Sequence, residues 1–264
     1  MIEATLALLF GLLIGSFLNV CIHRWPRGRS VVRPRSHCVR CRKIIAWYDN
    51  IPVVSYLTLR GRCRNCGRHI SARYPAVELA TGLAFFWFVW RLGPGVEAAK
   101  MCVLAAILIA LLFSDLEKRI LPDELTLGGT LVGLAFAAFI PLRDESAMGL
   151  FWLMGLSPQG RWLWLATAAV GALVPAVFLW GGGWLYLKVR GREGLGLGDV
   201  KLMMMVGAFL GLQMALATLL WGSIAGSVIS LLYIWLAKKD ASTYQLPFGT
   251  FLSLAALVIA LWGA

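Results

Sequence analysis

Long apolar runs separated by short polar segments extend along the whole chain. A helix needs about 20 mostly apolar residues to cross the hydrocarbon core of a bilayer. By this measure, single membrane-spanning helices are predicted at residues 2–22, 76–90, 98–114, 122–142, 162–187 and 246–262. The run at 200–235 is too long for one helix and predicts a hairpin that breaks near residues 207–213. The expected fold is an all-α polytopic membrane protein with about eight transmembrane helices.

The composition excludes a soluble globular protein, and the charges predict the orientation in the membrane. Of the 264 residues, 59% are hydrophobic and 14% are charged, whereas soluble domains carry about 25% charged residues. Thirteen of the 25 Lys and Arg residues lie between Arg24 and Arg73, where Asp49 is the only acid. Basic loops mark the cytoplasmic side of a membrane protein. We therefore expect a multi-pass protein with its N-terminus outside and the segment 23–74 in the cytoplasm.

The net charge of +12 is also compatible with nucleic-acid binding. No helix-turn-helix or RNP-like pattern accompanies the basic block, however, and such a pattern is typical of nucleic-acid-binding modules. We therefore expect membrane lipid, and no nucleic acid, around this protein.

Four cysteines in the polar segment form two C-x2-C pairs, Cys38 with Cys41 and Cys63 with Cys66. Two such pairs can close tetrahedrally on one Zn²⁺, with bonds of about 2.3 Å. Two disulfides are the alternative, but a reducing cytoplasm disfavours them. All four ligand positions would be filled, so the predicted zinc site is structural. The expected organisation is a first transmembrane helix at 1–22, a cytoplasmic tetracysteine zinc domain at 23–74 and a seven-helix transmembrane core at 75–264.

Two acids stand at the predicted cytoplasmic ends of membrane helices. Asp115 follows the apolar run that ends the third predicted span, and Asp199 precedes the run at 200–235. Ionisable groups near bilayer depth are costly and are therefore candidates for function. Two carboxyl groups held close together share a proton, so that one serves as a base and the other as an acid. Such a pair can activate water against a peptide bond.

Residues near these acids have supporting roles or plain structural explanations. Gly196 and Gly198 precede Asp199 and would let an extended substrate backbone approach closely. Lys201 is either an electropositive neighbour of Asp199 or a lysine that extends to the interface. Asp123 starts the fourth predicted span, where the helix dipole favours negative charge. A second glycine run, at residues 181–183, is expected to let helices pack closely.

Taken in order, these motifs resemble those of the bacterial type IV prepilin leader peptidases, the bifunctional prepilin peptidase/N-methyltransferases. The resemblance extends from Gly15 to at least Phe248. The residues that carry it are 15–20, Arg24, Pro26, 36–38, Cys41, 47–52, 59–63, Cys66, Ile70, Ser71, 73–75, Val77, Glu78, Asp115, 121–123 and 196–202. A single G-x-G-D motif is weak, but this ordered set on the predicted topology is specific.

The resemblance implies an aspartic endopeptidase of the bacterial inner membrane with its dyad at Asp115 and Asp199. Its substrates would be type IV prepilins and type II secretion pseudopilins, which lose a short basic leader after a Gly. S-adenosylmethionine would then supply a methyl group to the new N-terminus. Nearby acids, including Asp123, could receive the basic leader.

Other functions stay open at this point. A protease without methylation would share the same motifs. A non-enzymatic membrane scaffold explains the cysteines but gives no role to two acids on separate helices. An ion-coupled transporter would use the acids to bind a cation, but such proteins often contain inverted repeats, and no repeat is evident.

Overall fold

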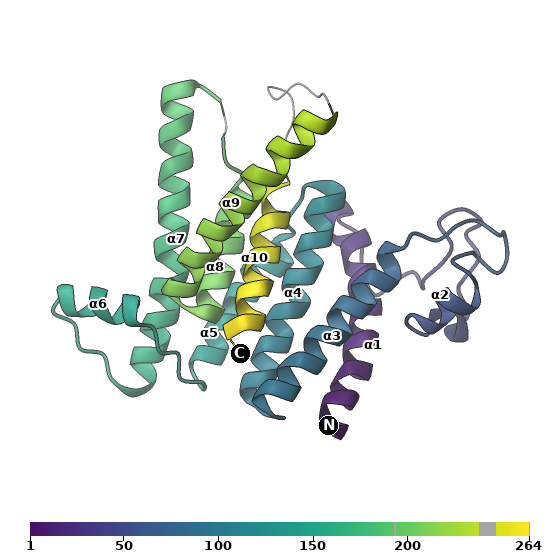
Figure 1. The fold of residues 1–264 in the computed structure, drawn as a ribbon, viewed down its shortest axis with the longest axis horizontal. Helices are drawn as coiled ribbons and strands as arrows, with labels where there is room; N and C mark the ends of the chain where they lie inside the picture. The colour runs from purple at the N-terminus through teal and green to yellow at the C-terminus, as the bar shows by residue number, and fades with distance from the viewer. Residues whose placement is uncertain (193, 238–246, 264) are drawn as a thin grey trace. The chain divides into compact units, whose positions relative to one another are not determined.

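The computed structural model describes residues 1–192, 194–237 and 247–263, and this part of the chain is helical apart from turns and two isolated β-bridges. It forms two compact units, residues 1–114 and 115–263 (Figure 1). The boundary falls within α4 (Val96–Lys118), whose last turn begins the second unit. The predicted division into a first helix, a zinc domain and a core, with boundaries after residues 22 and 74, describes which parts lie in the membrane. It stays a prediction.

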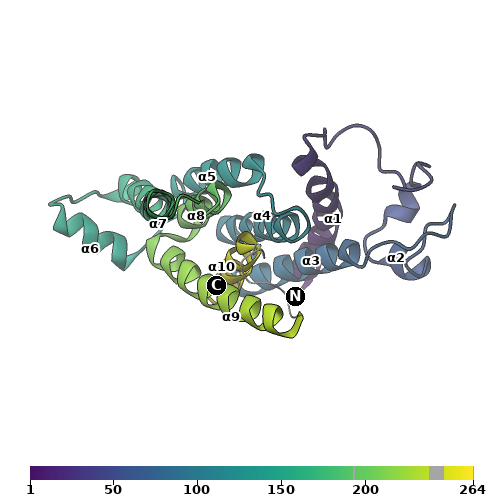
Figure 2. The same ribbon diagram turned by 90° about the horizontal axis from the view of Figure 1, so that it is seen from above.

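The first unit is organised around two helices that pack along their length, α1 (Ile2–Arg24) and α3 (Arg73–Leu92) (Figure 2). Glycines on α1 allow this approach: a Cβ atom on Gly11 would lie 2.8 Å from the Cα atom of Gly82, and one on Gly15 would lie 2.7 Å from that of Glu78. Small residues at a helix contact let two backbones come close. The amino-terminal span predicted from the sequence is therefore paired with the second one.

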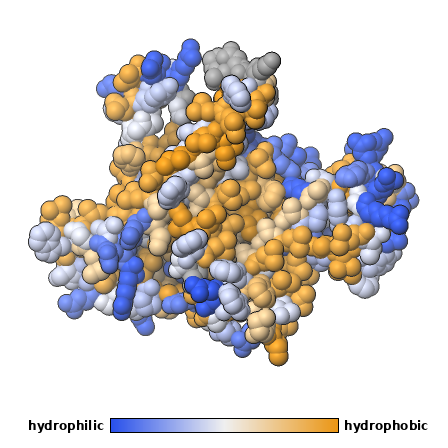
Figure 3. All heavy atoms as spheres, viewed as in Figure 1, coloured by the Kyte–Doolittle hydropathy of each residue, from blue (hydrophilic) through white to orange (hydrophobic). Residues whose placement is uncertain are grey.

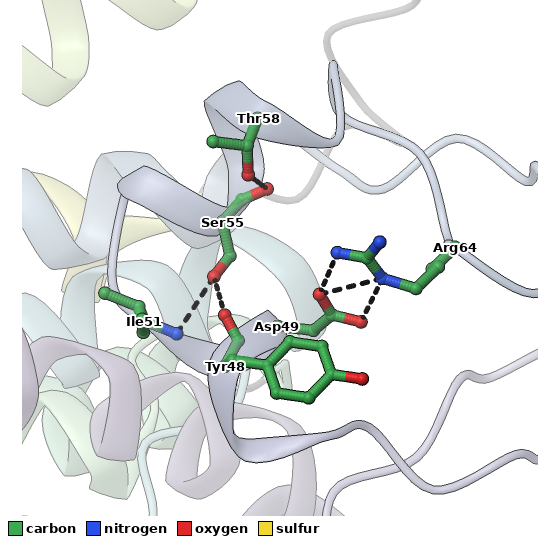
Figure 4. Close-up of polar contacts among 6 residues, drawn as sticks. All are labelled: Tyr48, Asp49, Ile51, Ser55, Thr58 and Arg64. Atoms are coloured by element: carbon green, nitrogen blue, oxygen red, sulfur yellow. Dashed lines mark hydrogen bonds and ion pairs between the residues drawn. The ribbon is translucent and has the colours of Figure 1, made fainter.

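The cysteine segment connects these two helices through short elements, η1 (Trp25–Arg27), η2 (Trp47–Asn50) and α2 (Val54–Thr58). Ser55 joins η2 to α2, because its hydroxyl donates to the carbonyl of Tyr48 and accepts from the backbone N–H of Ile51 (Figure 4). Glu78 on α3 accepts the backbone N–H of Val53 at 2.8 Å. Hydrogen bonds rather than a large apolar core thus order this segment.

The second unit contains the end of α4 and all later helices. These are α5 (Asp123–Ala137), α6 (Glu145–Leu153), α7 (Gly160–Arg190), α8 (Leu197–Leu210), α9 (Leu212–Ala237) and α10 (Phe248–Gly263). Helix α8 packs against α5 and α7, while α9 packs against α10 and α7 (Figures 1 and 2). Buried side chains such as Met203, Met205 and Phe209 make α8 the centre of this unit.

A helix occupies each segment that the apolar runs predict to be helical. The predicted hairpin break is confirmed at Gly211, which separates α8 from α9 and has a φ of 85°, a value that favours glycine. The interval 143–161, which lies between two predicted spans, contains α6. Asp144 explains this helix, because its carboxylate accepts the N–H of Ala147 within the first turn.

Four helical segments in the described part of the chain are long and apolar enough to cross a membrane: Ile2–Arg27, Val96–Lys118, Gly160–Arg190 and Leu212–Ala237. Helices α5, α8 and α10 are shorter. Hydrophobic residues dominate the visible surface over α9 and α10, and hydrophilic residues gather around the cysteine segment (Figure 3). A membrane protein is therefore supported, and the number of eight crossings stays a prediction.

The glycine run at 181–183 does not form the expected helix contact among the described residues. A Cβ atom on Gly181 or Gly182 would meet nothing within 4 Å, and one on Gly183 would meet only the side chain of Leu195. The close helix contact of α7 lies instead at Gly171, where a Cβ atom would be 2.5 Å from the carbonyl oxygen of Gly207 on α8. The expectation failed because packing depends on the helix face, which the run alone does not reveal.

Candidate functional site

Asp115 lies in the last turn of α4 and is buried, with 5% of its surface exposed. Its Oδ2 atom accepts two hydrogen bonds from Thr250 on α10. The backbone N–H of Thr250 donates at 2.6 Å and the hydroxyl at 2.8 Å. Asp115 is therefore held in place by a helix 135 residues away in sequence.

Asp199 lies in the first turn of α8 and is half-buried. Gly196 caps this helix end with extended backbone, and the N–H of Asp199 donates to its carbonyl at 3.1 Å. The carboxyl group of Asp199 is within electrostatic range of Asp115. Both predicted acids thus belong to the second unit, lie on separate helices and act on each other electrostatically.

Leu121 packs between two glycines that adjoin this pair. A Cβ atom on Gly198 would lie 3.3 Å from the Leu121 side chain. One on Gly249 would lie 2.8 Å from the same side chain and 3.2 Å from Cγ of Asp115. The space left by the missing Cβ of Gly198 is thus next to Leu121, whereas Gly196 is exposed beside the Asp199 carboxyl group.

Lys201 and Asp123 bind each other. The Lys201 ammonium group donates to both carboxylate oxygens of Asp123, at 2.7 and 2.9 Å. The pair links the start of α8, which also contains Asp199, to the first residue of α5. Lys201 therefore has an acidic partner, and the carboxylate of Asp123 has a cationic partner in addition to the helix dipole.

The four predicted cysteine ligands come together in the first unit. Their sulfur atoms all lie within 4.8 Å of one another, and the Sγ atoms of Cys38 and Cys66 are 3.8 Å apart. Four thiolates around one Zn²⁺ with bonds of about 2.3 Å have sulfur atoms roughly 3.8 Å apart. None of the cysteines in the described residues forms a disulfide. The set can therefore hold a metal ion, and its geometry fits zinc.

Each of the two cysteine pairs lies in a turn of the same kind. The N–H of Cys38 donates to the carbonyl of Lys43, and the N–H of Cys63 donates to that of Arg68. Each turn also contains a residue with left-handed backbone, Arg42 with φ 58° and Gly67 with φ 65°. Burial raises the pKa of the Cys38 thiol, but hydrogen bonds from the N–H groups of Cys41 and Arg40 outweigh it, and the pKa falls to about 6. A thiolate suited to bind a metal is thereby favoured.

An ion pair joins the second cysteine turn to η2. The guanidinium group of Arg64 binds the carboxylate of Asp49 through both oxygens, with a shortest contact of 2.7 Å (Figure 4). Hydrogen bonding to Arg64 holds the pKa of Asp49 below its ordinary value. Arg64 therefore stabilises the segment through Asp49, the one acid among its many basic residues.

Sequence reasoning located Asp115, Asp199 and the cysteines but missed Thr250 and Gly249. These residues have no charge and belong to no metal-binding pattern, so only their contacts with Asp115 reveal them. His37 and His69, which adjoin the cysteine pairs, are exposed.

Two family models match most of the chain. The model of the bacterial peptidase A24 N-terminal domain matches residues 9–92, and that of the type IV leader peptidase family matches residues 102–231. The first match contains the cysteine cluster, and the second contains both acids. No solved structure matches the chain.

Curated relatives match nearly the whole chain, and all three described here are named prepilin leader peptidase/N-methyltransferase. The protein of Pseudomonas putida is 36% identical over 98% of this chain and 90% of its own length. That of Myxococcus xanthus is 44% identical over 88% of this chain and 63% of its own length. That of Pseudomonas aeruginosa is 34% identical over 97% of this chain and 89% of its own length. The chain belongs to the type IV leader peptidase family.

Proposed function

We propose that this protein removes the leader peptide from type IV prepilins and type II secretion pseudopilins, with Asp115 and Asp199 as its catalytic dyad. The observation that carries the proposal is the pair itself. Two acids from separate helices lie within electrostatic range of each other, one of them fully buried. Family membership and the names of the relatives support the same activity.

The dyad would act by sharing one proton. The ionised carboxylate takes a proton from water while the water oxygen forms a bond to the carbonyl carbon of the scissile peptide. The protonated partner gives its proton to the carbonyl oxygen. When the tetrahedral intermediate collapses, the C–N bond breaks and the leaving amine takes the proton that the first carboxylate had accepted from water. A hydroxyl of the intermediate returns a proton to the partner carboxylate. Both acids are then restored to their starting states.

The substrate would reach the dyad along Gly196. This residue is exposed beside the Asp199 carboxyl group and has no side chain that would obstruct an extended peptide. A prepilin keeps its apolar helix in the bilayer and its leader in the cytoplasm, so its scissile bond lies near the interface. Gly198 and the Lys201–Asp123 pair would support the first turn of α8 around this path.

The same protein would then methylate the new N-terminus, as the names of the relatives indicate. S-adenosylmethionine is the methyl donor that we propose as co-substrate. The amine nitrogen forms a bond to the methyl carbon, the sulfonium sulfur keeps the electron pair of the broken S–C bond, and the amine releases a proton.

Zinc is the metal that we propose for Cys38, Cys41, Cys63 and Cys66. The four thiolates would fill its coordination, so the ion would stabilise the segment and would have no position left for substrate. The basic residues of this segment support a cytoplasmic location, with the N-terminus of the chain on the opposite side of the inner membrane.

The test compares Asp115→Asn and Asp199→Asn with the parent protein in membranes that contain a type IV prepilin. Both variants are expected to insert normally and to lose cleavage, because an amide neither takes up nor releases the required proton. Asp144→Asn is the matched control, since Asp144 is a buried acid that caps α6 away from the dyad. Mass spectrometry of the pilin measures both cleavage and methylation. Retained cleavage in both dyad variants would refute the assignment.

A further inference from the structure

The two acids of the dyad have unequal surroundings. Asp115 accepts the N–H and the hydroxyl of Thr250 on the same oxygen, and the positive charge of Arg119, the residue that follows α4, also acts on it. Asp199 accepts the backbone N–H of Gly196. Hydrogen bonds from donors, and a nearby positive charge, favour the ionised form of a carboxyl group. These contacts favour negative charge on Asp115 more than the single contact favours it on Asp199, and they oppose the deeper burial of Asp115, which disfavours charge.

Other charged groups near the pair do not reverse this difference. Lys201, on the same helix as Asp199, binds the carboxylate of Asp123 at the start of α5. Helix α10, which provides Thr250, contains no charged residue. Asp199 and Asp115 also act on each other, and like charges keep two neighbouring carboxyl groups from ionising together.

We propose that Thr250 is a positioning residue that places the negative charge of the dyad on Asp115 and leaves the shared proton on Asp199. Asp115 then takes the proton from water, and Asp199 protonates the carbonyl oxygen of the scissile peptide. This inference rests on the proposed function, since it assigns roles within that dyad. Thr250 acts through Asp115 and needs no contact with the substrate.

The experiment measures the pH dependence of prepilin cleavage by the full-length protein in lipid nanodiscs. Thr250→Val has nearly the same shape as the parent residue and removes only the hydroxyl donor. Loss of one hydrogen bond to a charged carboxylate should move the acidic limb of the pH profile up by about one to two pH units. Thr250→Ser keeps the hydroxyl and should retain the parent profile.

Thr130→Val is the matched control. Thr130 is also buried in the second unit, but its hydroxyl donates to the carbonyl of Thr126 within α5. This variant should leave the acidic limb unchanged, which separates the effect on Asp115 from a general loss of packing. If Thr250→Val does not insert into the membrane, Thr250→Ser and Thr250→Ala form a second pair that differs by the hydroxyl alone.

The inference is supported if the acidic limb moves up in the variant without the hydroxyl and stays in place in Thr250→Ser and Thr130→Val. It is overturned if the profiles of Thr250→Val and the parent coincide, if Thr130→Val shifts equally, or if the limbs of Thr250→Ser and Thr250→Ala coincide. Retained cleavage in both single variants, Asp115→Asn and Asp199→Asn, would instead refute the proposed function. The two failures can therefore be told apart.

Discussion

Gly171 of α7 and Gly207 of α8 touch backbone to backbone. A Cβ atom on Gly171 would lie 2.5 Å from the carbonyl oxygen of Gly207, and one on Gly207 would overlap the carbonyl oxygen of Gly171. Such a distance leaves no space for a methyl group on either helix. Because α8 begins at Leu197 and contains Asp199, this contact also determines where Asp199 lies relative to α7.

We therefore expect Gly207→Ala to destabilise the protein. The added methyl group would push α7 and α8 apart, and overpacking of this kind costs about 1–3 kcal/mol. Thermal unfolding of the purified protein in detergent measures the effect. Gly128→Ala on α5 is the control, because a Cβ atom there meets nothing within 4 Å and alanine favours a helix more than glycine does. Equal unfolding temperatures for Gly207→Ala and the parent would contradict the packing argument.

The Lys201–Asp123 pair predicts a specific pattern of non-additive effects. Lys201→Met and Asp123→Asn should each reduce prepilin cleavage, because each removes the link between α8 and α5 near Asp199. The pair is partly exposed, so we expect each change to cost no more than about 1 kcal/mol of stability.

The double variant should cleave no more slowly than the worse single variant, because one interaction is lost only once. Cleavage rates of all four proteins, measured at one prepilin concentration below saturation, provide the test. Losses that multiply in the double variant would show that the two residues act independently.

Removal of the metal should affect the cysteine segment first. The purified protein is expected to contain about one zinc ion per chain, because two C-x2-C pairs complete one tetrahedral site. The double variant Cys38→Ser with Cys63→Ser should lose the ion and become sensitive to protease within residues 23–74, because the segment has little apolar core of its own.

Metal content is measured by elemental analysis, and the cleavage pattern by limited proteolysis. Cys102→Ala is the control, since Cys102 is a buried cysteine outside the cluster. Equal zinc content in the double variant and the parent would argue against the site. Prepilin cleavage by the double variant shows in addition whether the second unit works without an ordered cysteine segment.

The amino-acid sequence by itself determined the elements and the chemical groups. Apolar runs specify where helices form, because hydrophobicity and helix propensity act over a few neighbouring turns. The spacing of Cys38 and Cys41 similarly specifies a local turn that presents two sulfur atoms. Asp115 and Asp199 stood out because charge is rare at the ends of apolar helices.

Only the tertiary structure decided which of these elements meet. Thr250 binds Asp115 across 135 residues, and Asp144 binds the N–H of Gln213 across 69 residues. The contact between Gly171 and Gly207 likewise depends on the faces that two helices present to each other. The physical reason is that side-chain packing and long-range hydrogen bonds depend on how distant segments come together, and no local pattern in the chain encodes that geometry.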